Sequence, residues 1–311
     1  MNTYNRLTPK LALQLAAPHT WVASACPVVF AILYCMVTGL HLNPVQIVCL
    51  VLASVLLQSA VNTLNDYVDY RKGADSKEDN VEVSDAVLVY AGINPQHALL
   101  LGSGYLLGGV VLGILASMFA GLTPILIGIV GVLAVLLYSG GPLPVSYLPV
   151  GEIVSGVIMG GFIPLGTAAC ADNRLHPEVL FWALPLIIGI GLIMMSNNGC
   201  DIEKDIAAGR HTLPVILGRA RTVRLYHGLL ILWLFLLSML PVALLGWAGL
   251  VSPVLLLTLA RRPFTWLLRS SLKPKLRIRQ MKTIVSANLF GNGAYIAALL
   301  VGLIVKVIAG N

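Results

Sequence analysis

Apolar runs long enough to cross a bilayer alternate with short polar segments along the whole chain. A transmembrane helix needs about 20 mostly apolar residues, and the pattern predicts spans near residues 20–40, 45–69, 97–119, 122–138, 151–171, 178–200, 222–246, 249–261 and 283–309. The eighth run is short. We therefore expect an all-α, polytopic membrane protein of about nine transmembrane helices, forming a single domain over residues 1–311.

Composition agrees with this pattern and excludes several classes of protein. Hydrophobic residues make up 58% of the chain and charged residues 11%, whereas soluble domains carry about 25% charged residues. The net charge of +7 is spread over short loops beside the spans, where it attracts membrane lipids with anionic headgroups rather than nucleic acid. The five cysteines show no CxxC spacing, so we expect packing residues rather than disulfides or metal ligands.

The positions of Lys and Arg orient the spans. If the N-terminus is cytoplasmic and the spans alternate, all of the 20 basic residues except Arg174 and Lys306 fall on the cytoplasmic side. The positive-inside rule favours this orientation. It predicts a multi-pass protein of the cytoplasmic membrane, in which the basic segment from Arg261 to Lys282 is a lipid-facing anchor.

The second apolar run ends in a polar helix face. Asn62, Asn65, Asp66 and Asp69 stand at i, i+3, i+4 and i+7, so a helix places two amides and two carboxylates on one side. Like charges at this spacing repel one another, and a cation between them relieves the repulsion.

A second cluster of the same kind ends the sixth apolar run. Asn197, Asn198, Asp201 and Asp205 stand at i, i+1, i+4 and i+8. Amides that enter a membrane helix are costly unless they have partners. Because the predicted orientation puts both clusters at the cytoplasmic face, we expect them to share a cation in one site that faces the cytoplasm.

The side chains of the two clusters indicate a magnesium-bound diphosphate. Mg²⁺ binds oxygen ligands, typically one or two carboxylates completed by substrate phosphates, and neighbouring Arg or Lys suits the remaining phosphate oxygens. We predict as catalytic Mg²⁺ ligands Asp66, Asp69, Asp201 and Asp205. The predicted diphosphate-binding residues are Asn62, Asn65, Arg71, Lys72, Asn197, Asn198, Lys204 and Arg210.

Asp75 leaves two interpretations open. Gly73 permits a turn that brings Asp75 back towards Asp66 as a further metal ligand. Alternatively, Asp75 begins an acidic loop that continues to Asp85, and charge runs of this kind are mostly solvated.

The apolar helices around the clusters predict the rest of the ligand. A diphosphate beside Leu, Val, Ile and Met side chains suggests a headgroup with a long isoprenoid tail, and loss of a metal-neutralised diphosphate leaves an allylic cation. His19, Tyr138, Asn288 and Asn292 are candidates for binding the acceptor or the tail. Alternatively, His19 and Tyr138 are interfacial residues, and the two asparagines form a hydrogen-bonded packing stripe with Tyr295.

Several motifs resemble those of the UbiA superfamily of intramembrane prenyltransferases. They are Asn-Asp-x-x-Asp from Asn65, Lys-Gly-x-Asp from Lys72, Asn-Asn-x-x-Asp-x-x-x-Asp from Asn197 and Gly-Arg-x-Thr-Leu from Gly209. The Asn-Asn pair is most similar to the menaquinone branch, the 1,4-dihydroxy-2-naphthoate polyprenyltransferases. The resemblance implies a nine-helix bundle around a central cavity, two Mg²⁺ ions, a polyprenyl diphosphate donor and an aromatic quinone-precursor acceptor, which in that branch loses its carboxylate.

The chain departs from the branch where arginines are common. Ala17 and Cys200 stand at two such positions, and Ser146 and Leu148 leave the segment after Tyr138 without a basic residue. Fewer cations near the acceptor end suggest a less anionic acceptor.

Three alternatives to prenyl transfer remain at this point. A terpene cyclase on the same scaffold would ionise the same diphosphate without an external acceptor. A cation-coupled secondary transporter would place its carboxylates at mid-bilayer on broken helices, whereas these acids end their runs. Charged helix ends held by surface salt bridges would not explain the amides one turn deeper in each run.

Overall fold

The computed structural model describes residues 4–73 and 87–310, and helices dominate this part of the chain. The longest uninterrupted helices are α2 Val22–Thr38, α3 Pro44–Lys72, α5 Pro95–Met118, α6 Leu122–Ser139, α10 Leu184–Cys200, α13 Arg219–Leu245 and α16 Arg277–Ile308. The shorter helices are α1 Pro9–Leu15, α4 Val87–Ala91, α7 Gly151–Ser155, α8 Ile163–Asp172, α9 Glu178–Trp182, α11 Ile202–Ala207, α12 Leu213–Leu217, α14 Val251–Leu255 and α15 Arg261–Leu267. The predicted helical membrane fold is confirmed.

Three predicted spans have a more irregular form than the apolar pattern suggested. The fifth joins α7 to α8 through a π-helical segment, Gly156–Phe162. The sixth is broken at Ala183 into α9 and α10. The eighth continues from α14 through a second π segment, Leu256–Ala260, into α15, so it is longer than the predicted 249–261.

Helix length and apolar composition support a multi-pass membrane protein. Five helical stretches of the described residues are long and apolar enough to cross a membrane, or six if the bent pair Pro9–Thr20 and Val22–Thr38 forms one span. Two shorter apolar helices, Leu122–Tyr138 and Leu184–Cys200, fall below that length. The predicted count of nine therefore stays a prediction.

Capping residues set the bounds of α3, which carries the first cluster. Asn43 accepts a hydrogen bond from the amide of Gln46 while the Gln46 side chain accepts one from the amide of Asn43, and Pro44 opens the helix. Gly73 ends the helix in the left-handed conformation, with φ of 67°. The polar face from Asn62 to Asp69 thus lies within the last turns of a continuous helix.

Small residues bring α3 and α5 into close contact. A Cβ atom at Gly102 would lie 2.9 Å from the Leu64 side chain, and one at Gly109 would lie 2.8 Å from Leu57. Gly102 and Gly109 therefore let the two helices approach closely, as is common between membrane helices.

The N-terminal segment packs on the same helix pair before the chain enters α2. Leu15 is buried with Val87, Leu88 and Ile93, and the chain then bends by 59° between the segment Pro9–Thr20 and α2. Ala17 sits in this bend with a φ of 46°.

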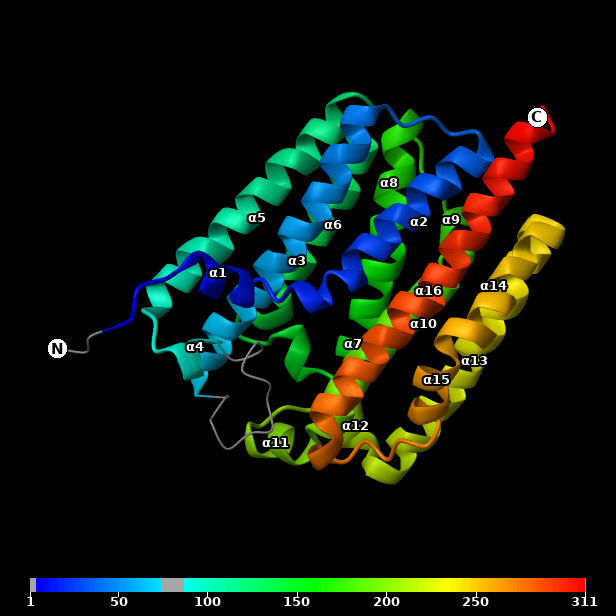
Figure 1. The fold of residues 1–311 in the computed structure, drawn as a ribbon. Coiled ribbons are helices and arrows are strands. Elements are labelled where there is room, and N and C mark those ends of the chain that lie inside the picture. Colours follow the sequence, from blue (N-terminus) through cyan, green and yellow to red (C-terminus); the bar gives the residue numbers. More distant parts are fainter. Residues whose placement is uncertain (1–3, 74–86, 311) are drawn as a thin grey trace.

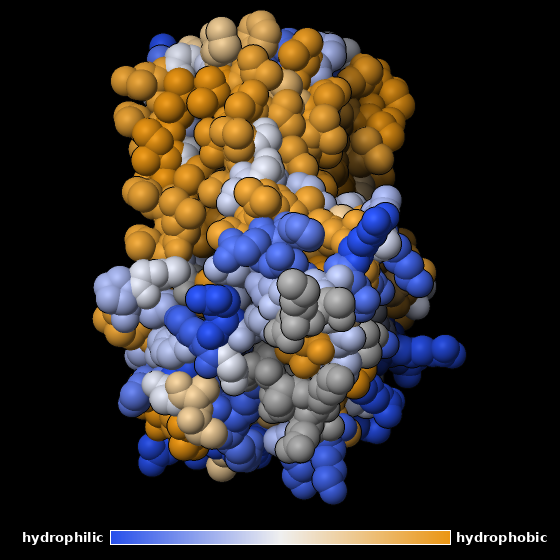
Figure 2. Space-filling view, turned by 90° about the vertical axis from the view of Figure 1, so that its left-hand side faces the viewer, coloured by the Kyte–Doolittle hydropathy of each residue, from blue (hydrophilic) through white to orange (hydrophobic). Residues whose placement is uncertain are grey.

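The molecule has a polar end and an apolar belt. In Figure 1, the short helices α4, α11 and α12 gather at the end opposite the C-terminus of α16. Figure 2 shows apolar side chains over the upper part of one face and hydrophilic side chains at its lower end. The C-terminal ends of α3 and α10, which carry the two clusters, therefore lie towards the polar end.

Candidate active site

A cavity of about 690 Å³ opens between the ends of α3, α10 and α16. It brings together most of the residues predicted for the site: His19, Asn62, Asn65, Asp66, Asp69, Tyr138, Asn197, Asn198, Asp201, Lys204, Asp205 and Arg210. The two clusters, more than 100 positions apart in the sequence, thus line one chamber.

The first cluster lies along one face of α3, as its spacing predicted. Asp66 and Asp69 are 6% and 8% exposed. Oδ2 of Asp66 accepts hydrogen bonds from the amides of Val87 and Leu88 at 3.0 and 3.4 Å, and Nδ2 of Asn65 donates to Oδ2 of Asp69 at 3.1 Å. These contacts hold the carboxylates in fixed orientations beside the cavity.

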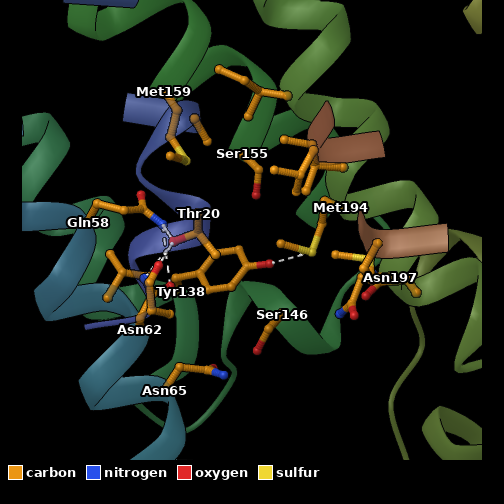
Figure 3. A pocket seen from close by; sticks show the side chains of 18 of the residues that line it. Thr20, Gln58, Asn62, Asn65, Tyr138, Ser146, Ser155, Met159, Met194 and Asn197 are labelled. Carbon is orange, nitrogen blue, oxygen red and sulfur yellow. Dashed lines mark hydrogen bonds between the residues drawn. The ribbon is translucent and has the colours of Figure 1, made fainter. Parts of the chain in front are cut away.

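Asn62 joins the first cluster to the bend before α2. Its Nδ2 donates to the carbonyl of Ala16 at 3.0 Å and to Oγ1 of Thr20 at 2.8 Å, and Gln58 donates to the same Thr20 hydroxyl at 3.3 Å. Figure 3 shows this group on one wall of the cavity. Asn62 therefore positions the segment that carries His19, in addition to its predicted place near the diphosphate.

The second cluster surrounds the break between α10 and α11. Asp201 separates the two helices, and Asp205 lies on α11. Nδ2 of Asn198 donates to Oε1 of Glu152 at 2.8 Å, and Thr212 donates to Oδ2 of Asp205 at 3.1 Å. Burial raises the pKa of the Asp205 carboxyl to about 6, against the opposing effect of the Arg210 charge.

Arg210 connects the two clusters. Its Nη2 donates to Oδ1 of Asp69 at 2.9 Å, and its Nη1 lies 3.8 Å from Oδ1 of Asp205. Burial alone would lower the pKa of this guanidinium, but Asp69 and Asp205 more than offset burial and raise it. The buried Nε of Arg210 has no hydrogen-bond acceptor among the described residues.

Arg277, which the sequence pattern did not single out, closes the second cluster. Its Nε donates to Oδ1 and Oδ2 of Asp201 at 2.8 and 2.9 Å, and its Nη2 donates to Oδ1 of Asn197 at 2.7 Å. Arg277 is 8% exposed, which corrects the prediction that the whole basic segment faces lipid. Cys200, at one of the positions where arginine was expected, is buried in the apolar core. The guanidinium beside Asp201 is supplied instead by Arg277 at the start of α16.

A weak signal for Arg277 was present in the sequence. It stands 11 residues before Asn288, and Gln280 lies between them at i+3 from Arg277, so a helix places all three on one face. Continuing the predicted stripe backwards from Asn288 would have reached Arg277.

Four predicted residues do not line the cavity. Asn288 and Asn292 are buried between helices: Nδ2 of Asn288 donates to the carbonyls of Gly189 and Ile284, and Nδ2 of Asn292 donates to Oδ1 of Asn288. This corrects their assignment to the acceptor or tail and favours the packing alternative. Arg71 and Lys72 are exposed at the end of α3, and Nζ of Lys72 lies 4.7 Å from the centre of the Tyr147 ring. Asp75 lies outside the described residues.

The inner part of the cavity is largely apolar. Val135, Ile158, Met159 and Ile190 line it. Tyr138 lies between Thr20 and Met194 in Figure 3, and its hydroxyl donates to Sδ of Met194 at 3.0 Å. One chamber thus combines a charged mouth with a wall that suits a hydrocarbon chain and an aromatic ring.

The donor set suits Mg²⁺ that is shared with a phosphorylated ligand. Within residues 4–73 and 87–310, no three His, Cys, Asp or Glu side chains are placed to hold a metal ion by themselves. Carboxylates supplied by α3 and by the α10–α11 junction, with phosphate oxygens as further ligands, match the preference of Mg²⁺ for one or two carboxylates. The arginines that contact Asp69 and Asp201 provide the cations that such a ligand needs.

Comparison with known proteins agrees with the motifs. The sequence model described as "UbiA prenyltransferase family" matches residues 24–305. The chain is 31% identical over 212 residues to the 1,4-dihydroxy-2-naphthoate octaprenyltransferase of Bacillus subtilis, covering 68% of this chain and 67% of that protein. It is 29% identical over 222 residues to human UbiA prenyltransferase domain-containing protein 1, covering 69% of this chain and 63% of that protein.

Solved structures share the fold at lower sequence identity. A UbiA homolog from Archaeoglobus fulgidus bound to GPP and Mg²⁺ superposes with a TM-score of 0.64 at 15% identity, covering 92% of this chain and 99% of that chain. The apo structure of a UbiA homolog from Aeropyrum pernix gives a TM-score of 0.62 at 15% identity, covering 93% of this chain and 98% of that chain.

Proposed function

The chain belongs to the UbiA prenyltransferase family, and from this premise we propose that it transfers a polyprenyl group from a polyprenyl diphosphate to an aromatic acceptor in a Mg²⁺-dependent reaction. The observation that carries the proposal is the convergence of two Asp-Asn clusters on one chamber whose inner wall is apolar. A diphosphate headgroup with an isoprenoid tail matches both parts of this chamber.

The charged mouth is assigned to the diphosphate. Asp66, Asp69, Asp201 and Asp205 would hold Mg²⁺, which neutralises the charge that develops on the leaving diphosphate. Arg210 and Lys204, both at the cavity, would bind phosphate oxygens directly. Their fixed positive charges favour the state in which the carbon–oxygen bond of the donor is breaking.

The inner wall is assigned to the prenyl chain and the acceptor. Breaking the bond to diphosphate leaves an allylic cation, and the apolar residues around Tyr138 exclude water that would otherwise capture it. The Tyr138 ring can stabilise this cation through its π-face. The aromatic carbon of the acceptor then forms the new carbon–carbon bond and loses a substituent, a proton or a carboxylate, to restore its aromaticity.

For the acceptor we propose 1,4-dihydroxy-2-naphthoate or a related quinone precursor. The Asn-Asn motif from Asn197 and the activity for which the Bacillus subtilis relative is named support this choice. The distribution of basic residues along the chain supports a site that faces the cytoplasm from the cytoplasmic membrane.

Mass spectrometry of the products tests the proposal. The purified chain is incubated with one polyprenyl diphosphate, Mg²⁺ and a panel of hydroxylated aromatic acids. We expect one prenylated product, whose mass also shows whether the carboxylate was lost, and no product in EDTA. Product formation that resists EDTA would contradict the metal-dependent reaction, and failure of every aromatic acid would contradict the acceptor class.

A further inference from the structure

Arg277 forms hydrogen bonds with two side chains of the second cluster that line the cavity, Asp201 and Asn197. Its guanidinium contacts both carboxylate oxygens of Asp201 and the amide oxygen of Asn197, at distances between 2.7 and 2.9 Å. Both Arg277 and Asp201 line the cavity. A divalent cation that coordinates Asp201 competes with this guanidinium for the lone pairs of the same two carboxylate oxygens.

Burial prevents Arg277 from simply giving up its anion. The residue is 8% exposed, and a buried cation that loses its counter-ion is strongly destabilised. If a metal ion takes Asp201, a second anion at the cavity can replace the contact that Arg277 loses. The planar fork of a guanidinium matches phosphate as well as carboxylate, and a diphosphate is the anion that the cavity is proposed to admit.

We propose that Arg277 is an exchange residue for the donor substrate. It pairs with Asp201 in the ligand-free site and transfers its guanidinium to a diphosphate oxygen when a divalent cation and the donor enter together. The inference rests on the proposed function, and it assigns to α16 a diphosphate-binding role. The metal ion and the diphosphate then bind cooperatively. The diphosphate draws Arg277 away from Asp201, which frees the carboxylate for the metal ion, and the metal ion at Asp201 frees Arg277 for the diphosphate.

The exchange predicts effects of opposite sign on two affinities. Without the guanidinium, Asp201 is released from its competitor, so a divalent cation alone binds more tightly. The complex of cation and pyrophosphate loses charge-assisted hydrogen bonds and binds more weakly, by about tenfold or more. A purely structural role for Arg277 would weaken both affinities.

Calorimetric titration of the detergent-solubilised full chain measures both quantities. Mn²⁺ is titrated alone, and inorganic pyrophosphate is then titrated in excess Mn²⁺, with Arg277→Gln compared with wild type. The matched control is Arg279→Gln, because Arg279 is an exposed arginine of the same helix that packs on the Trp266 ring. We expect wild-type affinities for the control. For Arg277→Gln we expect about threefold or greater tightening of Mn²⁺ and about tenfold weakening of pyrophosphate.

Unchanged or weaker Mn²⁺ binding by Arg277→Gln, or unchanged pyrophosphate binding, would overturn the proposal. If Arg277→Gln fails to fold, Arg277→Lys decides, since one ammonium cannot span both oxygens of Asp201 and Asn197. It should shift both affinities in the same directions by smaller factors, and wild-type values for both would overturn the proposal. A wild-type chain that binds no pyrophosphate in Mn²⁺ would instead remove the proposed function, and this inference with it.

Discussion

Nη2 of Arg210 lies 2.9 Å from Oδ1 of Asp69, although the two residues are 141 positions apart in the sequence. This ion pair ties the end of α3 to the segment after α11, so each Asp-Asn cluster is held in register with the other. Because the pair is largely buried, its geometry is part of the site rather than of the surface.

Replacing Arg210 should impair use of the donor more than use of the acceptor. Arg210→Ala removes both the bridge to Asp69 and a predicted phosphate contact, so we expect kcat/KM for the polyprenyl diphosphate to fall about 100-fold. The KM for the aromatic acceptor should change little. Steady-state kinetics with each substrate varied in turn measures the split, with Arg224→Ala, an exposed arginine on α13, as the control. Equal losses for both substrates would contradict a role at the diphosphate.

Asp66→Asn and Asp201→Asn should each reduce turnover at least about 100-fold while the protein remains folded. Asparagine retains an oxygen that can accept the hydrogen bonds now made to these carboxylates, but it removes the negative charge needed for Mg²⁺. Size-exclusion chromatography and thermal melting check the fold. A variant that keeps more than half of wild-type turnover would exclude that residue as a metal ligand.

Asn288→Ala should lower stability without changing either KM. Its amide bonds two backbone carbonyls inside the helix bundle, and such interhelical bonds in membranes contribute about 0.6 kcal/mol on average, up to about 2. We expect a lower melting temperature with both KM values within about twofold of wild type, an outcome that follows from the packing role. A large rise in the acceptor KM with unchanged melting would restore the original assignment to the acceptor.

Stability should depend on pH through His176, in the connection between α8 and α9. Burial lowers the pKa of His176, but hydrogen bonds with Asp172 and Glu178 at 2.9 and 3.0 Å outweigh burial and raise it. The charged form is thus bound more tightly in the folded state. This stabilisation is complete below the unfolded pKa of about 6.5 and is lost as pH rises through the folded pKa.

The effect should be small, at most about 1 kcal/mol, because the cluster is partly solvated. As pH rises from below about 6.5 to above the raised pKa of His176, the melting temperature of wild type should therefore fall by more than that of Asp172→Asn. Parallel pH profiles for the two proteins would show that the ion pair does not contribute.

The sequence predicted most of the site because helical spacing is local. Asp66 and Asp69, which stand seven and four residues before the glycine that ends α3, had to share a face once the apolar run was a helix. The family resemblance is confirmed by the match over residues 24–305. The amide positions of Asn62 and Asn198 were also predicted, though their partners Thr20 and Glu152 were not.

What the sequence missed depends on packing between distant segments. In the sequence, Arg277 is one of many basic residues in a predicted loop. Its partner Asp201 is 76 positions away, and only the close approach of α16 to the α10–α11 junction brings the two together. Asn288 looked like a ligand for the cavity, whereas contact with the Gly189 carbonyl places it between helices. Lys72 lies over the Tyr147 ring rather than at the predicted diphosphate site, and local spacing could not indicate this contact.

The stoichiometry of diphosphate release, with and without the aromatic acceptor, tests the central claim most directly. The purified chain is given a polyprenyl diphosphate and Mg²⁺, and released pyrophosphate is measured together with the organic product by mass spectrometry. We predict that pyrophosphate appears only when the acceptor is present and equals the prenylated aromatic product in amount. Pyrophosphate released without the acceptor, together with a cyclic hydrocarbon, would contradict prenyl transfer and identify a cyclase.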